Sequence, residues 1–182
     1  MRLDGERIRL EPVTAKHTDL IVRWRSDPGV IAQMFSERAL TAEEHLRWLR
    51  RLRREGTRRE FVIVLRDGDR PVGTIGLAGI DAVHRRAEYG ILIGDRAAEG
   101  RGFAREASEI LLAYAFDDLR LHRVFLQVFE GNRRAIALYE RLGFKHEGVL
   151  REAAWKRGRP VNIVVMAILR PEWTARGGRR LP

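Results

Sequence analysis

The sequence predicts a single-domain α/β fold in which about four helices flank a mixed central sheet of about seven strands. Its 182 residues are 45% hydrophobic and 33% charged, as in one soluble globular domain. Segments with the two-residue period of strands alternate along the chain with segments that have the 3.6-residue period of helices. One predicted helix lies between two buried strands, which indicates a right-handed crossover and therefore a partly parallel sheet.

The N-terminal half is predicted to contain a strand, two helices and a hairpin. The second helix starts at Thr41, where Glu44 three residues later completes a capping box, and it stops before Gly56. The Asp67-Gly68 dipeptide marks the turn of the hairpin. In chain order we expect a strand over 7–13, helices over 15–25 and 41–55, and a hairpin over 60–80.

The C-terminal half is predicted to contain a strand, a helix, a strand, a helix and a final hairpin. The first helix carries one apolar stripe, which includes Ala107, Leu111 and Tyr114. The second helix is capped by Asn132 and ended by Gly143. In chain order we expect a strand over 85–95, a helix over 103–116, a strand over 122–129, a helix over 133–142, and strands over 144–155 and 159–169.

Residues 1–173 form the predicted domain, and residues 174–182 a basic, flexible tail. The chain has no cysteine, which excludes disulfides, thiolate zinc sites and a cysteine nucleophile. It shows neither an apolar signal segment nor a run near the roughly 20 apolar residues that span a bilayer, so we expect a cytoplasmic protein without membrane contact. No metal is expected, because no helical spacing relates the five histidines, His17, His45, His84, His122 and His146.

The net charge of +10 is the most conspicuous global feature, and only three of the 35 basic residues are lysines. We favour the interpretation that arginine replaces lysine across an ordinary solvated surface. A different class of function is the alternative: a basic nucleic-acid-binding module that keeps the fold only as a scaffold. Nucleic acid is not expected, because the aromatic residues are not interleaved with arginines as in a single-strand platform.

Gly100 and Gly102 stand directly before the helix predicted from Phe103. Glycines let the main chain approach a bulky group, and the free N–H groups at a helix start bind anions. By itself the stretch also fits a flexible strand-to-helix turn, and it lacks the third glycine of a dinucleotide fingerprint. Its place after a buried strand favours a phosphate cradle. The residues of this cradle would be Gly100, Arg101, Gly102, Phe103, Ala104 and Arg105.

A second motif, NRRAIALYERLGF over 132–144, follows at a fixed distance from EGRGFA over 99–104. Together they resemble the acyl-CoA loop and the later Asn-x-x-Ala-x-x-Leu-Tyr-x-x-x-Gly-Phe signature of the GNAT superfamily of acetyl-CoA-dependent N-acetyltransferases. The resemblance extends over nearly the whole chain and implies a GNAT-like fold, with acetyl-CoA as the co-substrate and its pyrophosphate in the cradle. Glu99 departs from the pattern, which usually has glutamine or arginine there.

The resemblance also implies roles in acetyl transfer. Tyr139 is similar to the family's general acid, which protonates the departing sulfur, and Glu88 to its base, acting through water. Each also fits a purely structural role, as a core tyrosine or an exposed carboxylate. Because the chain has neither a cysteine nor a Gly-x-Ser-x-Gly elbow, we expect direct transfer in a ternary complex. The family pattern places a strand bulge and a thioester-binding N–H near Ile91 or Leu92. The other cofactor contacts would be Ile93, for the pantetheine arm, and Asn132, which also suits a helix cap.

The resemblance implies that the acceptor is a primary amine, on a small molecule or at a protein N-terminus. WRSDPGVIAQMF over 24–35 is similar to enzymes that acetylate the 4-amino group of a UDP-linked sugar on the pseudaminic acid pathway, and we lean toward that acceptor. N-terminal acetylation of a ribosomal or other protein is the alternative. Trp24, His45 and Trp155 are candidate acceptor contacts, although core packing is the more common role for any single tryptophan. A homodimer is compatible with the sequence.

Overall fold

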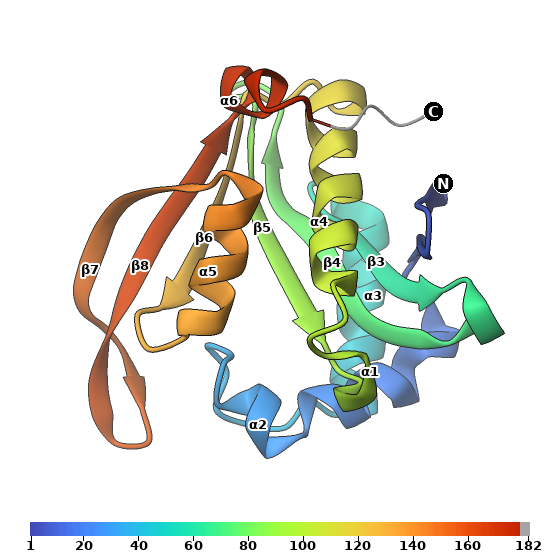
Figure 1. Ribbon diagram of the computed structural model, residues 1–182. Coiled ribbons are helices and arrows are strands. Elements are labelled where there is room, and N and C mark those ends of the chain that lie inside the picture. Colours follow the sequence, from blue (N-terminus) through green and yellow to red (C-terminus); the bar gives the residue numbers. More distant parts are fainter. Residues whose placement is uncertain (179–182) are drawn as a thin grey trace.

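The computed structural model describes residues 1–178, which form one mixed sheet with helices on both faces (Figure 1). The eight strands have the order β1-β2-β3-β4-β5-β6-β8-β7, and only β5 and β6 are parallel neighbours. The strands are β1 (Leu3–Asp4), β2 (Ile8–Pro12), β3 (Arg59–Leu65), β4 (Pro71–Asp81), β5 (Arg86–Ile93), β6 (Arg123–Phe129), β7 (Lys145–Lys156) and β8 (Arg159–Leu169). The helices are α1 (Thr18–Arg25), α2 (Pro28–Ile31), α3 (Ala42–Glu55), α4 (Phe103–Ala113), α5 (Arg133–Leu142) and α6 (Arg170–Ala175).

The predicted α/β fold and its element order are confirmed, with three short additional elements, β1, α2 and α6. The two-residue strand β1 and the four-residue helix α2 are too short to show a period in the sequence. The helix predicted over 103–116 is present, and its last turn continues as a π-helical segment over Tyr114–Asp118. None of the helices in residues 1–178 is long and apolar enough to cross a membrane.

Two apolar cores lie on opposite faces of the sheet, because side chains alternate along each strand. Ile63 of β3 packs into the larger core, which is covered by α4 and α5. Val62 and Val64 pack into the smaller core beneath α1 and α3. Figure 1 shows α4 and α5 in front of the sheet and α3 behind it. The two faces therefore meet different helices, and a ligand that passes through the sheet would contact both sets.

The C-terminal residues extend the helical part of the chain beyond the predicted domain boundary at residue 173. Within the predicted tail, α6 continues to Ala175. Beyond the helix, Arg176 Nη2 donates to the carbonyl of Arg141 at 2.8 Å. The N–H of Gly178 donates to the carbonyl of Trp173 at 3.1 Å. Residues 179–182 lie outside the described part of the chain.

Buried Glu106 attaches the start of α4 to the N-terminal hairpin. Its Oε1 accepts the backbone N–H groups of Arg7 at 2.8 Å and of Ile8 at 3.3 Å. Its Oε2 accepts the Arg7 Nε–H at 2.9 Å. Arg7 also donates from Nη1 to the carbonyl of Arg101 at 3.1 Å, so one carboxylate anchors the arginine that contacts the glycine loop.

We expect Glu106→Ala to lower the free energy of unfolding by about 2–4 kcal/mol, because it leaves buried N–H donors unpaired. Urea denaturation measures the change. The matched control is Glu109→Ala, since Glu109 pairs with Arg105 on the helix surface and such pairs contribute about 0.3–0.5 kcal/mol. Equal effects of the two substitutions would contradict an anchoring role for Glu106.

Candidate active site

The two parallel strands at the centre of the sheet pair only over a short length. Residues 86–88 of β5 face residues 123–125 of β6, and from there the two strands diverge, as Figure 1 shows. Strand β5 stays paired with β4 as far as Ile93, and β6 stays paired with β8 as far as Phe129. The second half of β5 therefore has an open edge that faces the gap.

The backbone groups at this open edge can be assigned from the pairing with β4. The N–H of Gly94 donates to the carbonyl of Val72 at 2.9 Å, and the direction alternates along an antiparallel strand. The backbone of Leu92 therefore faces β4, and that of Ile91 and Ile93 faces the gap. The expected bulge near Ile91 or Leu92 is corrected here, because the register is regular from Gly73↔Ile93 to Ala78↔Glu88 and shifts only beyond Ala78.

A cavity of about 1090 Å³ occupies the gap and continues toward α1 and α2. The predicted catalytic residues Tyr139 and Glu88 both line it. Arg101 is the one predicted cofactor residue that does not, since its carbonyl binds Arg7 and its guanidinium lies over the Phe103 ring at 5.5 Å. The predicted cofactor residues in the lining are Ile91, Leu92, Ile93, Gly100, Gly102, Phe103, Ala104, Arg105 and Asn132.

The glycine loop presents the start of α4 to this cavity. Gly100 and Gly102 have φ of 72° and 84°, in the left-handed region that favours glycine. Gly102 is the N-cap of α4 and has no side chain to cap the helix, so the first N–H groups of an 11-residue helix are free to bind an anion. A pyrophosphate fits this cradle. The residues present therefore suit coenzyme A.

Two side chains border the mouth of the cradle. Glu99, the departure from the family pattern, forms an ion pair with Arg134 of α5 and so connects the glycine loop to the opposite wall. Asn132 caps α5, because its Oδ1 accepts the N–H of Ala135 at 3.2 Å. The capping role predicted for Asn132 is confirmed, and its contact with the cofactor stays a prediction.

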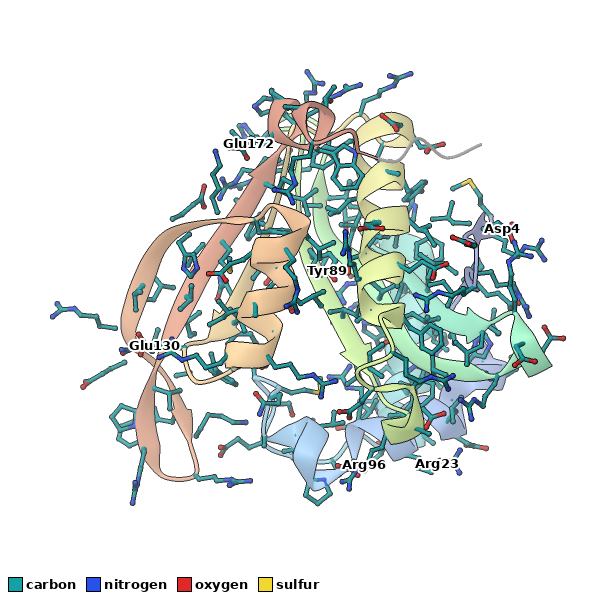
Figure 2. The ribbon with its side chains drawn as sticks, in the orientation of Figure 1. Asp4, Arg23, Tyr89, Arg96, Glu130 and Glu172 are labelled. Carbon is teal, nitrogen blue, oxygen red and sulfur yellow. The ribbon has the colours of Figure 1, made fainter. Side chains whose placement is uncertain are left out.

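Three aromatic rings fill the narrow end of the gap. Tyr139 of α5 lies 5.8 Å from Tyr89 in an edge-on arrangement and 5.9 Å from Phe144, between ring centroids. The Tyr89 hydroxyl shares a 2.6 Å hydrogen bond with Ser108 of α4, and Figure 2 shows Tyr89 between the two helices. Burial raises the pKa of Tyr139 to about 12, so this hydroxyl on the cavity wall keeps its proton at neutral pH.

The opposite end of the cavity, toward α1, is lined by charged groups that the sequence did not single out: Arg25, Arg58 and Glu60. Arg58 Nη1 lies 3.7 Å from Glu60 Oε2. Burial raises the pKa of the Glu60 carboxyl to about 7, and the positive charges of Arg58 and Arg25 offset part of this rise. Burial also lowers the pKa of Arg25. The sequence did contain a signal for Glu60, because this carboxylate begins the otherwise apolar segment EFVIVL, residues 60–65.

The three residues predicted to contact the acceptor lie elsewhere. Trp24 is buried in the smaller core, against the backbone of Gly94. His45 is 2% exposed, and its Nδ1 shares a 3.0 Å hydrogen bond with Thr18. Trp155 is 66% exposed on β7 and is not among the residues that line the cavity. Core packing accounts for Trp24 and His45, and none of the three lines the cavity.

The Acetyltransferase (GNAT) domain model matches residues 7–145, more than half of the chain. The chain belongs to the GNAT acetyltransferase family. It is 31% identical over 172 residues to the uncharacterized N-acetyltransferase p20 of Bacillus licheniformis, covering 92% of this chain and 96% of that protein. It is 35% identical over 117 residues to spermidine N(1)-acetyltransferase of Escherichia coli K12, covering 64% of this chain and 61% of that protein.

A solved structure supports the same assignment. The structure of spermidine N-acetyltransferase from Vibrio cholerae in complex with CoA and spermine matches with a TM-score of 0.88 and 27% identity, covering 93% of this chain and 99% of that one. The GNAT protein described here is an acetyl-CoA-dependent N-acetyltransferase.

We expect Gly102→Val to weaken acetyl-CoA binding about tenfold or more, a loss of about 1.4 kcal/mol or more. A β-branched side chain disfavours the φ of 84°, and a Cβ would lie 3.3 Å from Arg7 Nη2. The matched control is Gly158→Val, since Gly158 has a φ of 73° in an open turn with no neighbour within 4 Å. Calorimetry should show normal affinity for this control, and normal affinity in Gly102→Val would move the phosphate site elsewhere.

Proposed function

We propose that this enzyme acetylates a primary amine by direct attack in a ternary complex, and that the acceptor carries an anionic group near the amine. The observation that supports the anionic group is the pair of guanidiniums, Arg25 and Arg58, on the cavity wall toward α1. Among the side chains that the structure describes, none forms a hydrogen bond or an ion pair with the Arg25 side chain, and burial lowers the pKa of Arg25. A half-buried guanidinium without such a partner favours an anionic ligand.

Side chains alternate between the two faces of the sheet along β5, and this alternation supports a separate face for each substrate. Ile91 and Ile93 pack with the core beneath α4 and α5, and Leu92 packs with the core beneath α1 and α3. Glu88 and Gly90 share the Leu92 face, because side chains two residues apart lie on one face of a strand. We infer that the cofactor binds from the α4 side, along the open edge, while the amine approaches from the α1 side.

Acetyl transfer then needs three groups. The amine nitrogen attacks the thioester carbonyl carbon, a C–N bond forms and the C–S bond breaks. The N–H of Ile91 or Ile93 would donate to the carbonyl oxygen, where negative charge develops. Tyr139 would donate its proton to the departing sulfur and regain one from the nitrogen. In total, an ammonium and acetyl-CoA give an amide, free coenzyme A and one proton. The family resemblance assigns removal of the first ammonium proton to Glu88.

A UDP-linked 4-amino sugar is the acceptor that we put first, since its diphosphate provides the anion for Arg25 and Arg58. N-terminal acetylation of a ribosomal or other protein is the alternative. Spermine, bound in the matched Vibrio cholerae structure, is a third candidate because of the structural similarity. The cavity disfavours a polycation, however, because the two guanidiniums would repel it.

We expect Tyr139→Phe to lower kcat about 100-fold or more, the contribution of a positioned general acid, and to leave acetyl-CoA affinity unchanged. Thiol release and calorimetry measure the two quantities. The matched control is Tyr114→Phe, since Tyr114 is a core tyrosine whose ring packs edge-on against Phe61 at 6.0 Å. Unchanged turnover in Tyr139→Phe would remove Tyr139 from the reaction.

We expect thiol release with a UDP-linked 4-amino sugar to exceed that with N-terminal peptides and with spermidine. Arg58→Gln should raise KM for the sugar about tenfold or more, since a hydrogen bond to a charged group contributes about 1.5–3 kcal/mol. The neighbouring Arg59→Gln is the control, because Arg59 Nη1 donates to the carbonyls of Gly56 and Arg58 instead. A preference for spermidine that Arg58→Gln leaves unchanged would contradict the anionic acceptor.

A further inference from the structure

We infer that Glu60, on β3, is the catalytic residue that takes the proton from the acceptor ammonium. The inference rests on the proposed direct transfer and assigns its first proton step to a residue outside β5. It comes from the register of three strands, the room left by two glycines and the charges around one carboxylate.

The register places Glu60 in a row that leads to the gap. Glu60 is the pairing partner of Gly76 on β4, and Gly76 is the pairing partner of Gly90 on β5. The Glu60 carboxylate lies over Gly76, because a Cβ built at Gly76 would be 2.5 Å from Glu60 Oε2. Neighbouring strands are about 4.8 Å apart, so this carboxylate lies roughly one strand spacing from Gly90.

The two glycines keep this path open. A side chain at Gly76 would displace the carboxylate, and a Cβ built at Gly90 meets no atom within 4 Å. Gly90 lies two residues beyond Glu88, and Glu88↔Phe125 is the last pair before β5 and β6 separate. Glu88 therefore lies beside the closed end of the gap. Glu60 is directed at its open part, where an amine can reach the thioester.

The environment of Glu60 suits a proton acceptor. Its side chain is 19% exposed, on the cavity wall. The charged groups that face it are Arg58, directly before β3, Arg25 at the end of α1, and Glu88 on the same face of β5. Helix α3 places Trp48 beside these groups, with its ring centroid 6.0 Å from the guanidinium carbon of Arg58. With a pKa of about 7, Glu60 is a stronger base at neutral pH than an ordinary carboxylate.

The proton balance of the step is simple. One N–H bond of the ammonium breaks, and the proton passes to a Glu60 carboxylate oxygen, directly or through one water. The neutral amine then holds the lone pair that attacks the thioester. A free alkylamine has a pKa near about 10, so a partner with a pKa of about 7 makes the transfer less uphill than one near 4.5. The carboxylic acid returns its proton to solvent after each turnover.

The kinetic test compares the pH dependence of kcat/KM in the wild type, Glu60→Gln and Glu88→Gln, with whichever amine of the panel is turned over. We expect wild-type kcat/KM to rise with pH through about 7, as the Glu60 carboxyl loses its proton. Glu60→Gln should lower kcat about 100-fold and abolish this rise, with unchanged acetyl-CoA affinity. Glu88→Gln should keep the rise. A rise near 7 that persists in Glu60→Gln and disappears in Glu88→Gln would overturn the inference.

A second measurement needs no acceptor. NMR of protein labelled with carboxyl-¹³C glutamate should show one resonance that titrates near pH 7, and this resonance should be absent from Glu60→Gln but present in the control Glu109→Gln. A protein without such a resonance would overturn the inference. Absence of turnover with every amine, while the resonance titrates as expected, would instead overturn the proposed function and leave Glu60 no proton to accept.

Discussion

The site depends on the separation of two parallel strands. If β5 and β6 stayed paired beyond Glu88 and Phe125, the backbone of Ile91 and Ile93 would be satisfied within the sheet. The separation is sustained from both sides, since β5 remains paired with β4 and β6 with β8. Between them, Tyr139 and the rings around it fill the narrow end. One interrupted ladder thus supplies the groove, unpaired backbone donors and a passage from one face of the sheet to the other.

The features that sequence predicts here are those set by residues close together in the chain. The capping box of α3 is present, with the Glu44 N–H donating to Thr41 Oγ1 at 3.2 Å and the Thr41 N–H to Glu44 Oε2 at 3.0 Å. The cap at Asn132 and the glycine loop are local in the same sense. Glu60 was not predicted, because its burial depends on Gly76 in the next strand and on α1. The core position of Trp24 could not be predicted for the same reason, since only the tertiary fold decides which side of α1 meets the core.

The two ends of the cavity differ in the kind of charge that they present to a ligand. At the cofactor end, free amides of α4 provide partial positive charge without any desolvated side chain. At the end that we propose for the acceptor, Arg25, Arg58 and Glu60 bring ionisable groups of both signs to one wall, and Arg58 Nη1 lies 3.7 Å from Glu60 Oε2. An ammonium beside an anionic group would match both signs at once. Neither a purely cationic nor a purely anionic acceptor provides this match.

The raised pKa of Glu60 also links acceptor binding to folding. A carboxyl whose pKa is about 7 in the folded protein, against an ordinary value near 4.5, binds more protons when folded than when unfolded between these pH values. The stability that its protonated form provides is complete below about pH 4.5 and is lost as pH rises through about 7. At neutral pH the ionised carboxylate is therefore a local cost to the fold, which its two arginine neighbours only partly offset. In the proposed site, the ammonium of the acceptor would supply the missing positive charge, so acceptor binding would also relieve the cost of the buried carboxylate.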